Sequence, residues 1–228
     1  MKLGVTLPSF RDDAEAVAAA RRAESAGVDG VFVFDHLWPL GQPARPALSC
    51  AVTLGAVAAA TRTVAVGPLV ARIGLVPDQI LVAQFRSLAH IAPGRVIATL
   101  GTGDRHSAAE NLAYGIAFDP PDVRRLAVAR CAATLLETGT PVWIGGGSTA
   151  TTELALEVGA AVNLWEAQPA AVAAMATRCE VTWAGPLSGP RPQMARWLSE
   201  LASAGASWAV CAWPDSVEAV VDAAQAVR

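Results

Sequence analysis

Short apolar runs alternate with amphipathic segments along the whole chain, and glycine marks many of the junctions between them. Three stretches share one pattern, in which a helix end is followed by a glycine and then an apolar run: 26–33, 158–164 and 204–210. Glycine readily takes the left-handed conformation that ends a helix, and a continuous apolar run is typical of a strand buried on both faces. Such short links between helix and strand predict βα units and a parallel sheet.

Read from end to end, the pattern predicts eight strands alternating with eight helices. The strands are expected at 2–7, 30–35, 63–71, 95–101, 141–145, 160–165, 179–184 and 207–213, and the helices at 13–26, 47–60, 78–92, 122–137, 149–158, 169–178, 190–204 and 215–227. Eight alternations in 228 residues are typical of a (β/α)₈ TIM barrel near its minimum size, so residues 1–228 are expected to form a single domain. A doubly wound open sheet is the alternative, but the turn after the first predicted strand lacks the glycines of a dinucleotide site.

Several predicted helices carry recognisable start signals. Asp12 or Asp13 is expected to cap the first helix, and Pro-Asp pairs are expected to open three others: Pro77-Asp78, Pro121-Asp122 and Pro214-Asp215. The segment 102–121 is the one long stretch without a clear pattern. Because long loops in compact domains are usually functional, this segment is expected to serve the site.

The composition is apolar, with 53% hydrophobic residues, 16% charged residues and a mean hydropathy of +0.39. These values exclude a disordered chain. The longest uncharged run, 46–61, is too short to span a membrane, and the first residues lack the apolar stretch of a signal peptide, so a cytoplasmic protein without a membrane partner is expected. A net charge of −3 and a pI near 5.6 offer no basic surface for nucleic acid. So few charges leave some helix faces apolar, which predicts a homodimer.

Cysteine and histidine spacings give no sign of a metal site. The four cysteines lie far apart and are expected to be small buried residues. Ligation by His36, His106 and Asp104 is conceivable, but their spacing matches no zinc pattern, so no metal is predicted.

Candidate site residues cluster where predicted strands end, the face that carries the active site in barrels of this kind. Asp35 and His36 end the second strand, and packing alone gives no reason for an acid beside an imidazole there. We therefore favour a functional role for the pair over one in which His36 is only hydrogen-bonded to Asp35 or to the backbone. His106 also falls on this face, where it either serves the site or points to solvent. His90, near the end of the third helix, is expected only to favour that helix end.

A glycine run and several tryptophans add to the predicted site. Gly145, Gly146 and Gly147 precede Ser148 and Thr149 at the start of a helix, an arrangement typical of a site for an anion or phosphate. Of the seven tryptophans, three come at or after strand ends and are candidates to wall a cleft for a flat ring: Trp38, Trp165 and Trp213. Two others, Trp143 and Trp183, lie within strands and are expected in the core.

Together these motifs resemble the luciferase-like family of oxidoreductases that use flavin or the deazaflavin coenzyme F420. The resemblance covers almost the whole chain and rests on four segments, 23–36, 66–70, 92–103 and 141–148: AESAGVDGVFVFDH, VGPLV, APGRVIATLGTG and PVWIGGGS. It implies a (β/α)₈ barrel, in agreement with the count of strands. It also implies a non-proline cis peptide bond behind the flavin ring, expected between Leu69 and Val70.

The resemblance further implies how the cofactor would lie across the C-terminal face. The residues expected at the ring are Asp35, His36, Leu69, Val70, Gly101, Thr102 and Gly103, and those expected at the phosphate are Gly145, Gly146, Gly147 and Ser148. Asp104 after this loop, followed by Glu110 and Asn111, looks more like the branch that uses F420, so F420 is preferred to FMN.

The activity that the resemblance implies is hydride transfer between F420 and a small organic substrate. His36 would exchange the accompanying proton, with Asp35 setting its tautomer and Asp104 or Glu110 as a second acid. An FMN-dependent monooxygenase is one alternative. Many family members are longer than this chain, so a flavin-binding protein without catalysis is the other.

Overall fold

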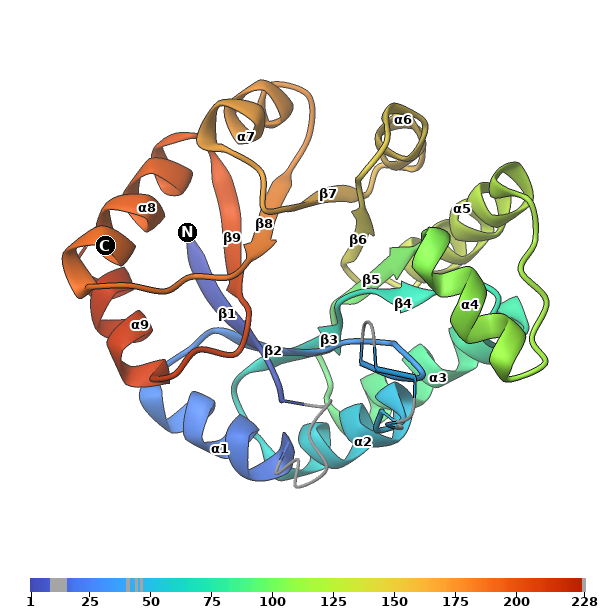
Figure 1. Cartoon of the computed structure of the whole chain (residues 1–228), viewed down its shortest axis with the longest axis horizontal. Helices are drawn as coiled ribbons and strands as arrows, with labels where there is room; N and C mark the ends of the chain where they lie inside the picture. Colours follow the sequence, from blue (N-terminus) through green and yellow to red (C-terminus); the bar gives the residue numbers. More distant parts are fainter. Residues whose placement is uncertain (9–15, 40–41, 44, 46, 227–228) are drawn as a thin grey trace.

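The computed structural model describes residues 1–8, 16–39, 42–43, 45 and 47–226. Within these residues the chain folds into a parallel β-barrel surrounded by helices (Figure 1). The strands are β1 (Lys2–Thr6), β2 (Gly30–Val33), β3 (Ala65–Pro68), β4 (Ala71–Arg72), β5 (Ala98–Gly101), β6 (Val142–Gly145), β7 (Ala161–Trp165), β8 (Val181–Gly185) and β9 (Ala206–Cys211). The helices are α1 (Ala16–Ala26), α2 (Cys50–Ala60), α3 (Asp78–Ile91), α4 (Arg105–Ala113), α5 (Pro121–Glu137), α6 (Thr149–Val158), α7 (Pro169–Ala176), α8 (Arg191–Ser203) and α9 (Val217–Gln225).

The strands follow one another around the barrel in the order β3-β2-β1-β9-β8-β7-β6-β5-β4. β3 and β4 are two pieces of the third barrel strand, interrupted at Leu69 and Val70, and the peptide bond between these two residues is cis. A parallel bridge between Val66 and Val96 joins β3 to the chain entering β5 and closes the barrel. The eight predicted barrel strands and the cis bond are therefore confirmed.

The helix start signals were partly right. α3 begins at Asp78 and α5 at Pro121, as the Pro-Asp pairs predict. The last helix begins later than expected, because Ser216 and not Asp215 is its N-cap and accepts the amide of Ala219 at 3.1 Å. The expected caps Asp12 and Asp13 lie outside the described residues.

The segment 102–121 is not one long loop, as the sequence analysis expected. It contains α4, whose first turn is closed by reciprocal hydrogen bonds between Asp104 and Ser107. Such a capping box satisfies amide groups that otherwise have no partner at a helix start. The helix stands at the C-terminal end of the barrel strands (Figure 1), and its Glu110 contacts His36 just after β2.

Aromatic rings fill the barrel interior. Phe32 stacks on Trp143 with ring centroids 5.4 Å apart, and Trp208 contacts both rings edge-on. Gly30 leaves room for this cluster, since a Cβ there would lie 2.9 Å from the Trp208 ring. Trp143 and Trp183 are both core residues, as expected, but Trp183 packs on the outside of the barrel against Trp197.

Polar side chains tie the chain together at the N-terminal end of the barrel. Asp29 accepts the amide of Leu3 at 2.7 Å, and Glu24 accepts the amides of residues 62 and 63 together with the Thr63 hydroxyl. Burial acts to raise the pKa of Glu24, but these hydrogen bonds outweigh it and lower that pKa to about 2. Arg95 donates to the carbonyls of Ala58, Thr61 and Val64. These contacts anchor the links between α1, α2 and β3.

Three of the four cysteines are buried. Cys50, Cys131 and Cys211 are buried as predicted, while Cys179 is only half-buried. None of the helices in the described part of the chain is long and apolar enough to cross a bilayer.

Candidate active site

The imidazole of His36 contacts a buried carboxylate at the C-terminal end of the barrel. His36 follows β2, and its Nδ1 lies 2.7 Å from Oε1 of Glu110 on α4. The Glu110 side chain is 0% exposed, whereas that of His36 is 21% exposed. Because a carboxylate only accepts, we assign the proton to Nδ1, and Nε2 is then the nitrogen that can exchange a proton with a substrate.

The second oxygen of Glu110 is held by two further donors. Oε2 accepts the amide of Leu37 at 2.8 Å and Nη2 of Arg72 at 2.9 Å. Arg72 ends β4, and its side chain is only 4% exposed. The guanidinium of Arg72 thus lies against the buried Glu110 side chain on the side opposite His36.

Asp35 has a different role from the one expected. Its carboxylate accepts the backbone amide of Arg72 at 3.0 Å, and its carbonyl accepts Nε of Arg72 at 2.9 Å. Burial raises the pKa of Asp35, although the amide and charge of Arg72 act against that rise. The carboxylate against Nδ1 of His36 is that of Glu110, so Glu110 rather than Asp35 sets the tautomer. Asp35 fixes Arg72 instead.

Asp104 is a helix cap in the structure. Its Oδ1 accepts the amides of His106 at 2.9 Å and Ser107 at 3.1 Å. Partial burial acts to raise the pKa of Asp104, but these hydrogen bonds outweigh it and the pKa lies below its usual value. An acid held ionised in this way is a poor proton donor near neutrality, so the expectation of Asp104 as a second acid loses its support. His106 is exposed on the first turn of the same helix.

The residues expected beneath a flavin ring meet at the break in the third strand. The side chain of Val70 lies against the Cα positions of Gly101 and Gly145, where a Cβ on Gly145 would approach it to 3.4 Å. Leu69 is buried in the barrel interior, while Val70 remains half-buried at the mouth. The glycines thus make room for the apolar Val70 side chain, against which the expected flavin ring would lie.

The loop after β5 is fixed by an arginine that the sequence analysis did not single out. Arg124 of α5 donates to the carbonyls of Thr102 and Gly103, and its Nε donates to the carbonyl of Asp119 at 2.9 Å. Gly103 has a positive φ of 70°, a backbone conformation that suits glycine. The Gly-Thr-Gly loop is therefore held in one conformation next to α4.

The turn between β6 and α6 has the features of an anion site. Ser148 caps α6 by accepting the amide of Thr151 at 3.2 Å, which leaves other amides of the first turn available to a ligand. A Cβ placed on Gly147 would meet no atom within 4 Å, so space opens beside this backbone. The turn therefore fits a phosphate, the group that the sequence analysis assigned to it.

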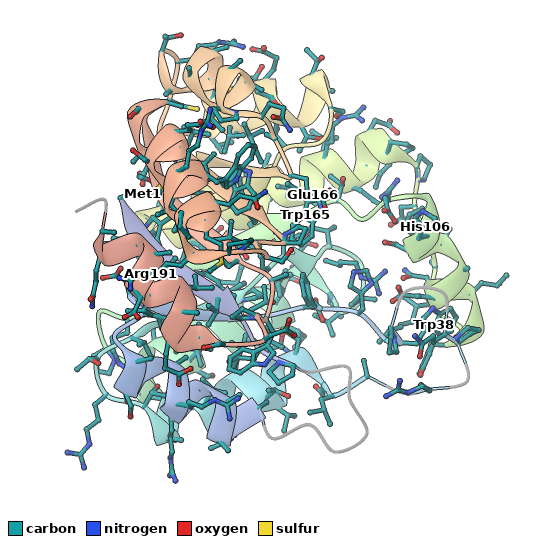
Figure 2. The ribbon with its side chains drawn as sticks, turned by 60° about the vertical axis from the view of Figure 1, so that its left-hand side comes forward. Met1, Trp38, His106, Trp165, Glu166 and Arg191 are labelled. Atoms are coloured by element: carbon teal, nitrogen blue, oxygen red, sulfur yellow. The ribbon has the colours of Figure 1, made fainter. Side chains whose placement is uncertain are left out.

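Of the three tryptophans expected to wall a cleft, Trp165 remains exposed at the barrel mouth, with 49% of its surface accessible. Trp38 packs on Tyr114 at the end of α4, with ring centroids 6.0 Å apart. Trp213 turns outward, where Arg22 of α1 lies over its ring, so it does not line the mouth. Figure 2 shows Trp38, His106, Trp165 and Glu166 on the side of the molecule away from Met1.

Comparisons with known proteins agree with this arrangement. A family model described as luciferase-like monooxygenase matches residues 1–127. An F420-dependent glucose-6-phosphate dehydrogenase of Beutenbergia cavernae is 42% identical over 83 residues, and one of Kineococcus radiotolerans is 36% identical over 119 residues. The matched parts are 36% and 52% of this chain but only 25% and 34% of those relatives.

A likeness to solved structures extends over the whole chain. An F420-dependent secondary alcohol dehydrogenase, solved with an F420-acetone adduct, superposes with a TM-score of 0.83 at 14% identity. The superposition covers 100% of this chain and 99% of that one, which shows a shared fold. Since the family model spans more than half of the sequence and the barrel is the same, the chain belongs to the luciferase-like monooxygenase family.

Proposed function

We propose that the chain is an oxidoreductase that moves a hydride between coenzyme F420 and a small organic substrate. The observation that carries the proposal is the contact between His36 and the buried Glu110, at the barrel mouth beside the support formed by Val70, Gly101 and Gly145. The relatives named for F420 dependence lend it further support.

The binding roles follow from the geometry. The ring would rest on Val70 and the Gly-Thr-Gly loop, and the amides after Gly147 would receive the phosphate. When bound, F420 would supply the acceptor of the hydride, so that an alcohol is oxidised to a ketone as F420 is reduced.

The protein's own part is to orient the substrate and to move a proton. As the hydride leaves carbon, Nε2 of His36 would take the proton of the substrate hydroxyl. The imidazolium that forms is stabilised by the Glu110 carboxylate at 2.7 Å. Arg72 holds Glu110 in place, and Asp35 holds Arg72 in place. An FMN-dependent monooxygenase and a flavin-binding protein without catalysis are the alternatives to exclude.

We expect F420 to bind with micromolar or tighter affinity and FMN to bind more weakly. Tryptophan fluorescence quenching in parallel titrations measures both affinities. Gly147→Asp should weaken F420 binding about tenfold or more, because a carboxylate then faces the phosphate. Gly147→Ala is the matched control and should weaken binding less than Gly147→Asp, since its methyl group enters the same space without adding a charge. Tighter binding of FMN would favour the monooxygenase, and failure of both ligands would contradict the proposal.

We also propose that the chain forms a homodimer through α2 and α3. A groove of about 530 Å³ with a mostly apolar lining runs between these helices and reaches Asp35, His36 and Arg72 at the candidate active site. Val52 of α2 is 72% exposed and Ile80 of α3 is 49% exposed. A second copy of the chain would cover this surface, in keeping with the low charge content.

Sedimentation at micromolar concentration should therefore give about twice the 23.4 kDa of one chain. Val52→Glu should shift the protein to a monomer, because the new carboxylate would be buried between two apolar faces. Val123→Glu is the control, since Val123 is exposed on α5, away from the groove. A monomeric parent protein, or dissociation caused by the Val123 change alone, would rule the proposed interface out.

A further inference from the structure

The end of β7 places an aromatic ring across the mouth of the barrel. β7 and β2 are separated in the sheet order by β8, β9 and β1, so their C-terminal ends lie on opposite sides of the mouth. Even so, the ring of Trp165 contacts that of Phe34, just after β2, with centroids 6.0 Å apart. His36 follows Phe34 by two residues, roughly 7 Å along an extended chain. Trp165 therefore stands near the proposed proton acceptor.

Glu166 is held beside this ring in an uncommon backbone conformation. Its φ is 52°, the only positive φ at a non-glycine residue among those the structure describes. The Glu166 amide donates to the carbonyl of Ala184 at 2.7 Å, and its Oε1 accepts Nε1 of Trp165 at 3.0 Å. Left-handed non-glycine residues cluster at functional sites, where the surroundings hold them. Here those contacts hold an exposed carboxylate at the edge of the Trp165 indole (Figure 2).

The positively charged side chains between β6 and α9 are paired with acids other than Glu166. From β6 to α9 the sequence has no lysine. Its three described arginines pair with acids on the surrounding helices: Arg178 with Glu153, Arg191 with Asp222 and Arg196 with Glu200. The wall of the mouth at β7 thus combines an apolar plate with a carboxylate, and a phosphate or carboxylate approaching it would meet repulsion.

We propose that Trp165 and Glu166 select the substrate, which is an apolar secondary alcohol carrying a second hydrogen-bond donor, neutral or cationic, and no phosphate or carboxylate. The apolar part would pack on the Trp165 ring, and the second donor would reach Glu166, while the reacting hydroxyl faces His36. Glu166 is then a specificity-determining residue. The proposal rests on the proposed function, because the reacting alcohol is the substrate of that same site.

Three probes with the same ring and different charge test this selection by calorimetry, without any turnover: cyclohexylammonium, cyclohexanol and cyclohexanecarboxylate. The parent protein should bind them in that order of decreasing affinity. Glu166→Gln should weaken ammonium binding about fivefold, as expected for an exposed charge pair, and leave cyclohexanol unchanged. Glu166→Lys should reverse the order of the two charged probes. Glu157→Gln, an exposed change at the far end of α6, should alter nothing.

Folding and cofactor binding are checked on the same preparations. Glu166→Gly suits the left-handed backbone, so it should fold normally and show the same loss of ammonium binding as the glutamine variant. F420 affinity should stay the same in all Glu166 variants. If F420 fails to bind, the proposed function is contradicted. The order of affinity for the three probes still tests whether Glu166 selects by charge. Equal binding of carboxylate and ammonium by the parent protein, or a ranking unaffected by Glu166→Lys, would overturn the selection role.

Discussion

Replacing His36 by alanine should lower turnover with F420 and a reactive alcohol about a hundredfold or more, because the step then lacks its general base. Cofactor affinity should stay within a few fold, since the proposed ring and phosphate sites lie on Val70, the Gly-Thr-Gly loop and the α6 turn. The melting temperature and the rate per folded molecule are measured on one preparation. These two readings separate a catalytic histidine from one that only completes the end of β2.

Asp35→Asn is the matched comparison for this experiment. Asparagine keeps an oxygen that can accept the amide of Arg72, and the tautomer of His36 is set by Glu110. We therefore expect a smaller loss of rate than for His36→Ala. A rate per folded molecule that is unchanged in His36→Ala, with only a lower melting temperature, would show that the pair serves packing alone.

Glu110→Ala should lower the free energy of unfolding by about 3–5 kcal/mol, the range found when one partner of a buried ion pair is removed. The change leaves the guanidinium of Arg72 buried without its carboxylate, and it also removes the acceptor of the Leu37 amide. Urea denaturation followed by circular dichroism measures this loss. Glu157→Gln, at an exposed position, should stay within about 0.5 kcal/mol of the parent protein.

A double variant, Arg72→Met with Glu110→Leu, separates the effect of this ion pair on the stability of the protein from its effect on the tautomer of His36. Replacing both charges by apolar groups should restore part of the stability, because Arg72 and Glu110 then leave no unpaired charge of their own, while Asp35 loses the nearby charge of Arg72. Nη1 of Arg72 already lacks a hydrogen-bond partner within the described part of the chain, so its removal carries little cost. Turnover should remain low, since His36 has lost the acceptor that sets its tautomer. A loss below about 1 kcal/mol in Glu110→Ala would contradict the assigned role of the pair.

The barrel could be predicted because its signals are local. Glycines such as Gly27, Gly159 and Gly205 do end helices or follow them with positive φ, and each is followed by a buried strand. Strand counting needs only such repeated junctions. The break at Leu69 and Val70 has no counterpart in the hydropathy pattern, which runs on as one apolar stretch, and it was expected only through the family resemblance.

The partner of His36 could not be predicted from spacing, because Glu110 lies 74 residues further along the chain. The sequence suggests Glu110 as a mark of the F420-using branch and as a second acid, but not as the partner of His36. It does not reveal α4 either, because the apolar positions of this helix show little helical periodicity. One signal was available, since Asp104 and Ser107 have the spacing of a capping box. That signal would have identified α4 and shown Asp104 as a cap.

Trp213 shows that locating the end of a strand does not tell which way a side chain there points. Side chains alternate along a strand, and in β9 Val210 points into the barrel while Cys211 belongs to the outer core. Trp213, two residues after Cys211, continues the outward series and meets Arg22 on α1. Applying the alternation beyond the strand end would have removed Trp213 from the predicted cleft.

The hydrogen bonds of Glu24, Asp29 and Arg95 lie at the end of the barrel opposite the candidate active site. They join backbone segments to one another, whereas Trp165 and Glu166 at the other end are exposed to incoming molecules. The two ends thus carry separate tasks, as is usual for barrels of this type. Selection for new substrates can therefore act on one end while the other keeps the scaffold robust, which gives an engineer a place to alter specificity without first rebuilding the protein.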